Sequence, residues 1–293
     1  MGHSRGWTLV EDVESPSPAE LTSRDLERYD RAMRFFRWVD LTPRTSSWEP
    51  QALLRAARVT VLGVGGTGGI AAQALAAAGV GHLHCADFDT VELSNLCRQV
   101  LYTEDDIGKP KVEAAVDRLR RLNSDIEITG QHMRATCQED VAVLLEGCDV
   151  FMLGADRPPE LRVWVNRASI AAGRPWIDAG YHGPRTQVGV YVPGTGACWE
   201  CTRVYNRERH EAMGADPDGP EGHIGAVWTA VGAVSAGISG YLAAHQVIAL
   251  ITGIPPVTPG RIDAVNLSAL DVPMVVDDPP HPDCPACGVS ARR

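Results

Sequence analysis

The sequence predicts an α/β protein with a doubly wound, mostly parallel sheet and an antiparallel C-terminal extension. Two observations lead to this fold class. Short apolar runs alternate with longer helical stretches between residues 59 and 179, a pattern typical of parallel strands joined by helices on both faces of a sheet. A glycine-rich loop, GVGGTGG at 63–69, follows the first of these runs, as in Rossmann-like nucleotide-binding units.

Residues 1–57 are predicted to form an N-terminal helical arm. Within it, 22–38 has the apolar spacing of an amphipathic helix, and a short helix is predicted near 50–57. Residues 58–180 are predicted to form the Rossmann-like half. Its predicted strands are 59–63, 82–87, 125–129, 150–154 and 176–179, and its predicted helices are the stretch from the glycine loop to Ala78, 111–123, 138–146 and 159–172.

The C-terminal half, residues 181–293, has a different pattern. Strands predicted at 186–192 and 260–265 flank an uncharged, Gly- and Ala-rich stretch, 224–244, which is long enough to cross a membrane. Its small residues favour a closely packed, buried helix of a soluble protein instead. The polar segment 202–222 is predicted to be a mobile crossover loop. Because the N-terminus lacks the basic-then-apolar order of a signal peptide, a cytoplasmic protein is expected.

The charge of the chain disfavours several classes of partner. The 293 residues carry a formal net charge of −10. This balance argues against nucleic acid or an anionic membrane as the main partner. A phosphate site must therefore be built locally, from a few basic residues and backbone N–H groups.

The glycine loop by itself favours a dinucleotide. Gly63, Gly65 and Gly68 fit the pattern GxGxxG between a strand and a helix. Asp87 ends the next predicted strand, about where the fingerprint places a ribose-binding acid. This signal is weak, because the backbone N–H groups of such a loop, including that of Gly66, bind any phosphate.

The residues after Asp87 favour a triphosphate. They supply polar and basic side chains in quick succession, namely Asp89, Asn95, Arg98, Gln99 and Lys111. NAD carries two phosphate charges and needs no basic pair such as Arg98 and Lys111, whereas ATP has a β–γ unit to neutralise. The plain alternative is that each of the two cations is a solvated surface charge.

At these residues the chain resembles the adenylating enzymes of the ubiquitin-activating type, and most of all the bacterial sulfur-carrier adenylyltransferases of molybdopterin and thiamine biosynthesis. The resemblance extends from about residue 28 to residue 288. It rests on RYDR at 28–31, GVGGTGG at 63–69, DFDTVELSNLCRQ at 87–99, GKPKVEAA at 108–115, AD at 155–156, CWEC at 198–201 and CPAC at 284–287.

The resemblance implies roles for the matching residues. The glycine loop would hold the phosphates of ATP, and Asp87 would bind the ribose. Arg98 and Lys111 would hold the triphosphate. Arg31 would reach into the active site of a partner subunit, which implies a homodimer.

The same resemblance implies that Asp156 helps to position Mg²⁺. In the family this acid is the centre of a Thr-Asp-Asn triplet, whereas here the triplet is Ala155-Asp156-Arg157. The loss of both neighbours leaves open which substrate tail the adjacent pocket accepts.

Two cysteine pairs predict a structural zinc knuckle. Cys198-x-x-Cys201 and Cys284-x-x-Cys287 supply four thiols, the number of ligands that a tetrahedral structural zinc takes. A redox dithiol or a pair of disulfides is the alternative. Four thiolates leave no open coordination position, so the role of the zinc would be structural.

These features predict ATP-dependent adenylation of the C-terminal carboxylate of a small carrier protein or peptide. An ionised carboxylate needs no general base, so positioning and charge neutralisation must supply the catalysis. Segment 202–222 contains no cysteine that could accept the acyl group, so an external sulfur or amine donor is expected to consume the acyl adenylate. The alternatives are an NAD-dependent oxidoreductase and a catalytically degenerate binding scaffold of the same fold.

Overall fold

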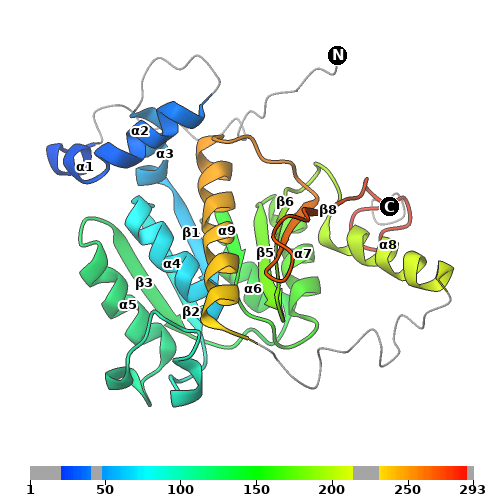
Figure 1. Cartoon of the computed structure of the whole chain (residues 1–293), viewed down its shortest axis with the longest axis horizontal. Helices are drawn as coiled ribbons and strands as arrows, with labels where there is room; N and C mark the ends of the chain where they lie inside the picture. Colours follow the sequence, from blue (N-terminus) through cyan, green and yellow to red (C-terminus); the bar gives the residue numbers. More distant parts are fainter. Residues whose placement is uncertain (1–20, 41–47, 214–230, 289–293) are drawn as a thin grey trace.

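A computed structural model describes residues 21–40, 48–213 and 231–288 (Figure 1). Its strands form one sheet in the order β3-β2-β1-β4-β5-β6-β7-β8. Strands β1 to β5 are parallel to one another, and β6, β7 and β8 are added in antiparallel pairs. The predicted fold class is therefore confirmed, including the antiparallel C-terminal strands.

The strands are β1 (Arg58–Leu62), β2 (His82–Asp87), β3 (Glu127–His132), β4 (Val150–Leu153), β5 (Trp176–His182), β6 (Arg185–Tyr191), β7 (Arg261–Asn266) and β8 (Met274–Asp277). The helices are α1 (Ser23–Arg28), α2 (Asp30–Val39), α3 (Glu49–Ala56), α4 (Gly66–Ala78), α5 (Lys111–Leu122), α6 (Gln138–Leu145), α7 (Leu161–Ala172), α8 (Trp199–Ala212) and α9 (Ala233–Thr252).

Helices cover both faces of the sheet, with α4, α5 and α9 on one face and α6 and α7 on the other (Figure 1). Successive residues of a strand point to opposite faces. Val61 of β1 accordingly lies in the core with α4 and α9, whereas Leu62 lies in the core with α6 and α7. Burial on both faces explains why the central strands are continuous apolar runs in the sequence.

The single N-terminal helix predicted over 22–38 is divided in the structure. Tyr29 separates α1 from α2 because its backbone leaves the helical conformation, with φ −102° and ψ 11°. The Tyr29 hydroxyl accepts a hydrogen bond from the Asn123 side chain at 2.8 Å. Its ring also lies against Gly79, the residue that caps the C-terminal end of α4. Tyr29 therefore anchors the arm at that end of α4.

The long apolar helix, α9, begins and ends later than the predicted 224–244, and residues 224–230 lie outside the described part of the chain. It continues through His245 and Gln246, which lie on its more exposed side. Within the described ranges it is the one helix long and apolar enough to cross a membrane. Half of that window is buried, against α4 and β5 among other elements, so α9 is a central helix of the domain.

The segment predicted as a crossover loop, 202–222, is helical in its first part. There α8 extends to Ala212, and residues 214–222 are not among those described. Only the first turn of α8 is buried, so its polar composition reflects solvent exposure rather than a loop. Strand β8 was not predicted, because a four-residue edge strand gives too short a pattern.

Candidate nucleotide and metal sites

The candidate nucleotide site lies at the carboxyl ends of the central strands. The strand order reverses at β1, which has β2 on one side and β4 on the other. In doubly wound sheets, ligands bind in the crevice at such a switch point. In this chain the loop after β1 is the glycine loop, and the loop after β4 contains Asp156.

Gly63 brings these two loops into contact. Its φ of +88° is in the left-handed region that favours glycine, and a Cβ at this position would lie 2.6 Å from the backbone nitrogen of Ala155. Gly65 caps α4, and Gly66 and Gly68 lie in its first turn. The predicted glycines therefore place the free N–H groups of a helix N-terminus beside Asp156.

Asp87 fixes the shape of the glycine loop. One carboxylate oxygen accepts a hydrogen bond from the Val64 N–H and the other from the Asp89 N–H, both at 2.8 Å. Burial raises the pKa of the Asp87 carboxyl, and these two N–H groups oppose that effect. The sequence assigned only ribose binding to this acid, and the structure adds a role in holding the loop.

Asn95 and Gln99 lie on the turn beside the loop and differ in their contacts. Asn95 is buried, and its side-chain oxygen accepts the N–H of Glu92 at 3.2 Å, so it shapes the turn. The amide nitrogen of Gln99 lies 3.6 Å from the position that a Cβ on Gly65 would take. The Gln99 amide oxygen is buried without a hydrogen-bond partner among the described residues. Gln99 therefore faces the glycine loop.

The two predicted cations have different surroundings. The side-chain Cγ of Arg98 lies 3.7 Å from the Cβ position of Gly66, so its stem packs on the first turn of α4. Lys111 begins α5, and its ammonium donates to the Asp89 carboxylate at 3.0 Å. The Lys111 side chain is only 7% exposed. A phosphate that reached Lys111 would have to share it with Asp89.

Asp156 lies at this edge, and Arg31 does not. Asp156 is exposed, directly after β4 and next to Ala155. The Arg31 side chain is 90% exposed and lies 3.8 Å from the Asp30 carboxylate. The arm is anchored at the far end of α4, and a helix of 13 residues is about 20 Å long. Figure 1 shows α1 and α2 at the end of the sheet opposite the start of α4.

Two tyrosines of this edge were not predicted. The Tyr102 hydroxyl donates a hydrogen bond to the carbonyl oxygen of Val64 at 2.7 Å and so helps to hold the glycine loop in place. Tyr181, near the end of β5, has its hydroxyl 3.0 Å from the Cβ position of Gly66. The sequence offered one signal that could have pointed to Tyr181, namely its position near the end of another strand of the same parallel sheet.

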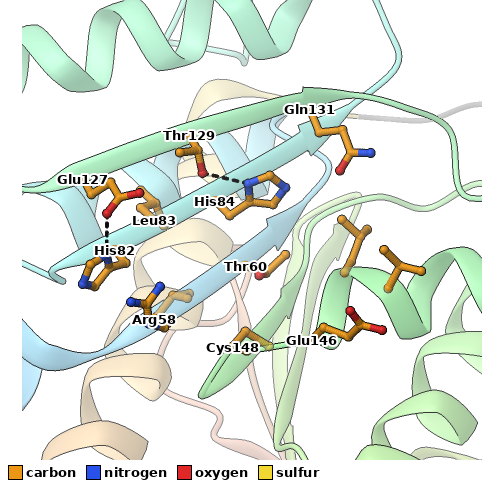
Figure 2. A pocket seen from close by; sticks show the side chains of 14 residues that line it. Arg58, Thr60, His82, Leu83, His84, Glu127, Thr129, Gln131, Glu146 and Cys148 are labelled. Carbon is orange, nitrogen blue, oxygen red and sulfur yellow. Dashed lines mark hydrogen bonds and ion pairs between the residues drawn. The ribbon is translucent and has the colours of Figure 1, made fainter.

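A polar groove of about 260 Å³ lies elsewhere, near the amino ends of β1, β2 and β3 (Figure 2). Four of its side chains form two hydrogen-bonded pairs, His82 with Glu127 at 2.9 Å and His84 with Thr129 at 2.8 Å. Burial lowers the pKa of His84. The glycine loop, Arg98 and Asp156 do not line this groove, so it is distinct from the candidate nucleotide site.

The four predicted metal ligands are brought together. The Sγ atoms of Cys198, Cys201, Cys284 and Cys287 all lie within 4.8 Å of one another. The closest pairs are 3.4 to 3.7 Å apart, and tetrahedral Zn²⁺ with Zn–S bonds of about 2.3 Å requires S···S distances near 3.8 Å. The four cysteines are unbridged. The donor set and the spacing therefore fit a four-thiolate metal.

The protein around the cluster orients these thiols. The backbone N–H of His281 donates to the Cys201 sulfur at 3.3 Å, and the Asn166 amide donates to the Cys198 sulfur at 3.6 Å. Hydrogen bonds from the Cys198 thiol and the His281 N–H help to lower the pKa of Cys201. Such contacts stabilise a thiolate, the form that binds a metal.

The sequence model of the ThiF family matches residues 29–286. The chain belongs to the ThiF family. It is 30% identical to molybdopterin-synthase adenylyltransferase of Escherichia coli, over 92% of the chain and 99% of that protein. It is 31% identical to sulfur carrier protein adenylyltransferase of Thermus thermophilus, over 91% of the chain and 92% of that protein.

The relatives of this chain differ in length. The chain spans about half (55%) of the bovine adenylyltransferase and sulfurtransferase MOCS3, to which it is 35% identical over 93% of its own residues. Among solved structures it is similar to E. coli MccB with ATP, with a TM-score of 0.75 and 27% identity over 89% of this chain and 74% of that one. E. coli MccB with MccA-N7isoASN gives a TM-score of 0.78 at 28% identity, with the same coverage.

Proposed function

We propose that this ThiF-family chain adenylates the C-terminal carboxylate of a small sulfur-carrier protein or a peptide, with ATP as co-substrate. The observation that carries the proposal is the grouping of Arg98, Asp156 and the first turn of α4 at one edge of the sheet. The named relatives include adenylyltransferases of sulfur-carrier proteins. The comparisons give no support to the NAD-dependent alternative. A cytoplasmic location is part of the proposal.

Adenylation requires that the negative charge of the phosphates is neutralised and that the carboxylate is positioned for attack. A carboxylate oxygen forms a bond to the α-phosphorus while the bond from that phosphorus to the pyrophosphate oxygen breaks, and no proton is transferred. The N–H groups at the start of α4 and the Arg98 guanidinium would hold phosphate oxygens. Lys111, shared with Asp89, would contribute a second positive charge.

Asp156 is the residue that would hold Mg²⁺. It is an exposed carboxylate in the loop after β4, and oxygen ligands are those that Mg²⁺ prefers. The metal would neutralise charge on the leaving pyrophosphate. In the cysteine cluster Zn²⁺ is proposed, as a structural ion that joins the start of α8 to the C-terminal residues.

The acyl adenylate would pass to an external sulfur or amine donor. A thiocarboxylate or an amide would result, depending on the donor.

Pyrophosphate exchange into ATP tests the proposal. The protein, Mg²⁺, ATP and labelled pyrophosphate are incubated with small carrier proteins ending in Gly-Gly or with short peptides. Exchange that requires one acceptor class is expected, because reversal needs an acyl adenylate. Absence of exchange with both classes, combined with tight binding of ATP, would favour the degenerate scaffold. Tight NAD binding and no ATP binding would favour the oxidoreductase.

We also propose that the working unit is a homodimer in which Arg31 acts in the partner's site. The distance between the arm and the glycine loop of the same chain supports it. The arm also exposes large apolar side chains, since Phe35 is 56% and Trp38 is 87% exposed. A second chain could cover these side chains.

Mixing two inactive variants tests the shared site. Arg31→Ala and Asp156→Ala are combined under conditions that allow subunits to exchange. A mixed dimer then has one site with both lesions and one intact site. Random mixing is expected to restore about a quarter of the wild-type sites, read as pyrophosphate exchange. Proven subunit exchange without recovery would mean that Arg31 does not act across an interface.

A further inference from the structure

Tyr181 is a residue of the nucleotide edge to which neither the motifs nor the family resemblance assigned a role. It lies in β5, which runs parallel to β4, and the last paired residue of β4, Leu153, is opposite Asp178. Tyr181 therefore lies three residues, or about 10 Å, beyond the paired end of β4. Alternation along the strand puts it on the same face as Ile177 and Ala179, which belong to the core beneath α4 and α9.

The Tyr181 hydroxyl lies over the N-terminus of α4. It is 3.0 Å from the position of a Cβ on Gly66, and the Cβ of Ala236 in α9 is 3.2 Å from the same point. Gly66 does not have a positive φ, so glycine is needed here for space rather than for backbone conformation. Gly66, Arg98, Ala236 and Tyr181 thus converge from four separate segments of the chain on one point.

The charges around the Tyr181 phenol suit a group that donates a hydrogen bond to an anion. Burial raises the pKa of Tyr181, partly offset by the Arg98 guanidinium and its hydrogen bond, while Asp156 adds to the increase. The phenol is therefore protonated at neutral pH, with an O–H that can donate. The Cγ of Arg98 lies 3.7 Å from the same point, which belongs to the first turn of α4.

We propose that the Tyr181 hydroxyl donates a hydrogen bond to the α-phosphate of the bound nucleotide, beside Gly66 and Arg98. This inference rests on the proposed nucleotide site. It assigns a direct contact with the reacting phosphate to a residue outside the motifs.

The order of residues along the sheet favours the α-phosphate. Asp87 ends β2, the glycine loop follows β1, Asp156 follows β4 and Tyr181 is near the end of β5. A nucleotide with its ribose at Asp87 places its first phosphate at the start of α4. The Tyr181 hydroxyl is 3.0 Å from the Cβ position of Gly66, in the first turn of that helix, so it lies beside this first phosphate.

Binding of AMP and adenosine tests the contact without requiring turnover. Isothermal titration calorimetry is carried out on the wild type, Tyr181→Phe and the control Tyr205→Phe, which removes a hydroxyl far along the chain in α8. Phe preserves the ring packing. Tyr181→Phe is expected to weaken AMP binding about tenfold, as for the loss of one hydrogen bond to a charged group, and to leave adenosine within about twofold. Tyr205→Phe is expected to change neither.

A second measurement checks the position of the hydroxyl. Gly66→Ala should lower the Tm, and adding Tyr181→Phe should recover part of that loss, because the added methyl group would meet the hydroxyl. An unchanged ratio of AMP to adenosine affinity in Tyr181→Phe, or no recovery in the double variant, would overturn the inference. Failure of binding by AMP to the wild type would overturn it as well.

The two proposals can fail separately. If the wild type gives no acceptor-dependent exchange while Tyr181→Phe still weakens AMP binding, the adenylation proposal is wrong and the phosphate contact stands. If exchange occurs and the affinity ratio is unchanged, the contact is wrong and the adenylation proposal stands.

Discussion

Replacing Arg98 by alanine is expected to lower the rate of acceptor-dependent pyrophosphate exchange by about a thousandfold or more. The Arg98 stem packs on Gly66, in the first turn of α4, and the guanidinium donates to the Ser94 carbonyl oxygen at 3.0 Å, so the charge lies near the N–H groups proposed to bind phosphate. A positive charge that acts on a phosphoryl transition state typically contributes about 10³- to 10⁵-fold in rate. Initial exchange rates at saturating ATP and acceptor measure the effect.

Arg121 provides a matched control for Arg98. Arg121 is a cation of the same type on α5, with its side chain 73% exposed and paired with Asp117. Arg121→Ala should retain exchange within about twofold, because exposed ion pairs contribute little. Arg98→Ala should also keep the wild-type Tm within a few degrees, since its charge is not part of either core. Full exchange activity in Arg98→Ala would rule out this position as the phosphate-binding cation.

Replacing Cys201 by serine is expected to remove the metal and to destabilise the C-terminal half. Cys201 is buried, and its sulfur lies 3.4 Å from that of Cys287 near the end of the chain. The two cysteine pairs are far apart in sequence, so the metal would act as a cross-link between α8 and the C-terminal residues. If metal binding contributes about 4 kcal/mol to the fold, its loss would lower the Tm by roughly 10 °C.

Elemental analysis after gel filtration and a thermal melt measure both effects. Wild-type protein should retain one zinc per chain, and Cys201→Ser should retain none. Cys97→Ser is the matched control, because Cys97 is exposed and remote in sequence from the cluster. It should keep both the metal and the Tm. Wild-type protein without bound metal, whose four cluster thiols all react with an alkylating agent, would contradict the zinc assignment.

Sequence alone determined the fold class, and it predicted most of the residues that lie at the candidate nucleotide edge. The continuous apolar strands and the glycine loop reflect burial on both faces and backbone conformation, which are local properties of the chain. The two CxxC pairs could be matched to a four-thiolate site because a metal requires a fixed number of ligands. The polar composition of residues 202–212 led to the wrong prediction of a loop, because an exposed helix can have the same composition.

Tertiary structure decided which of these residues meet. Asp89 pairs with Lys111 and Tyr29 holds the arm at the far end of α4, and both contacts join residues far apart in the sequence. Tyr181 has no motif around it, so only the parallel alignment of β5 with β4 reveals that its hydroxyl lies over Gly66. Such approaches depend on how separate strands and helices pack, which the order of residues within each element does not specify.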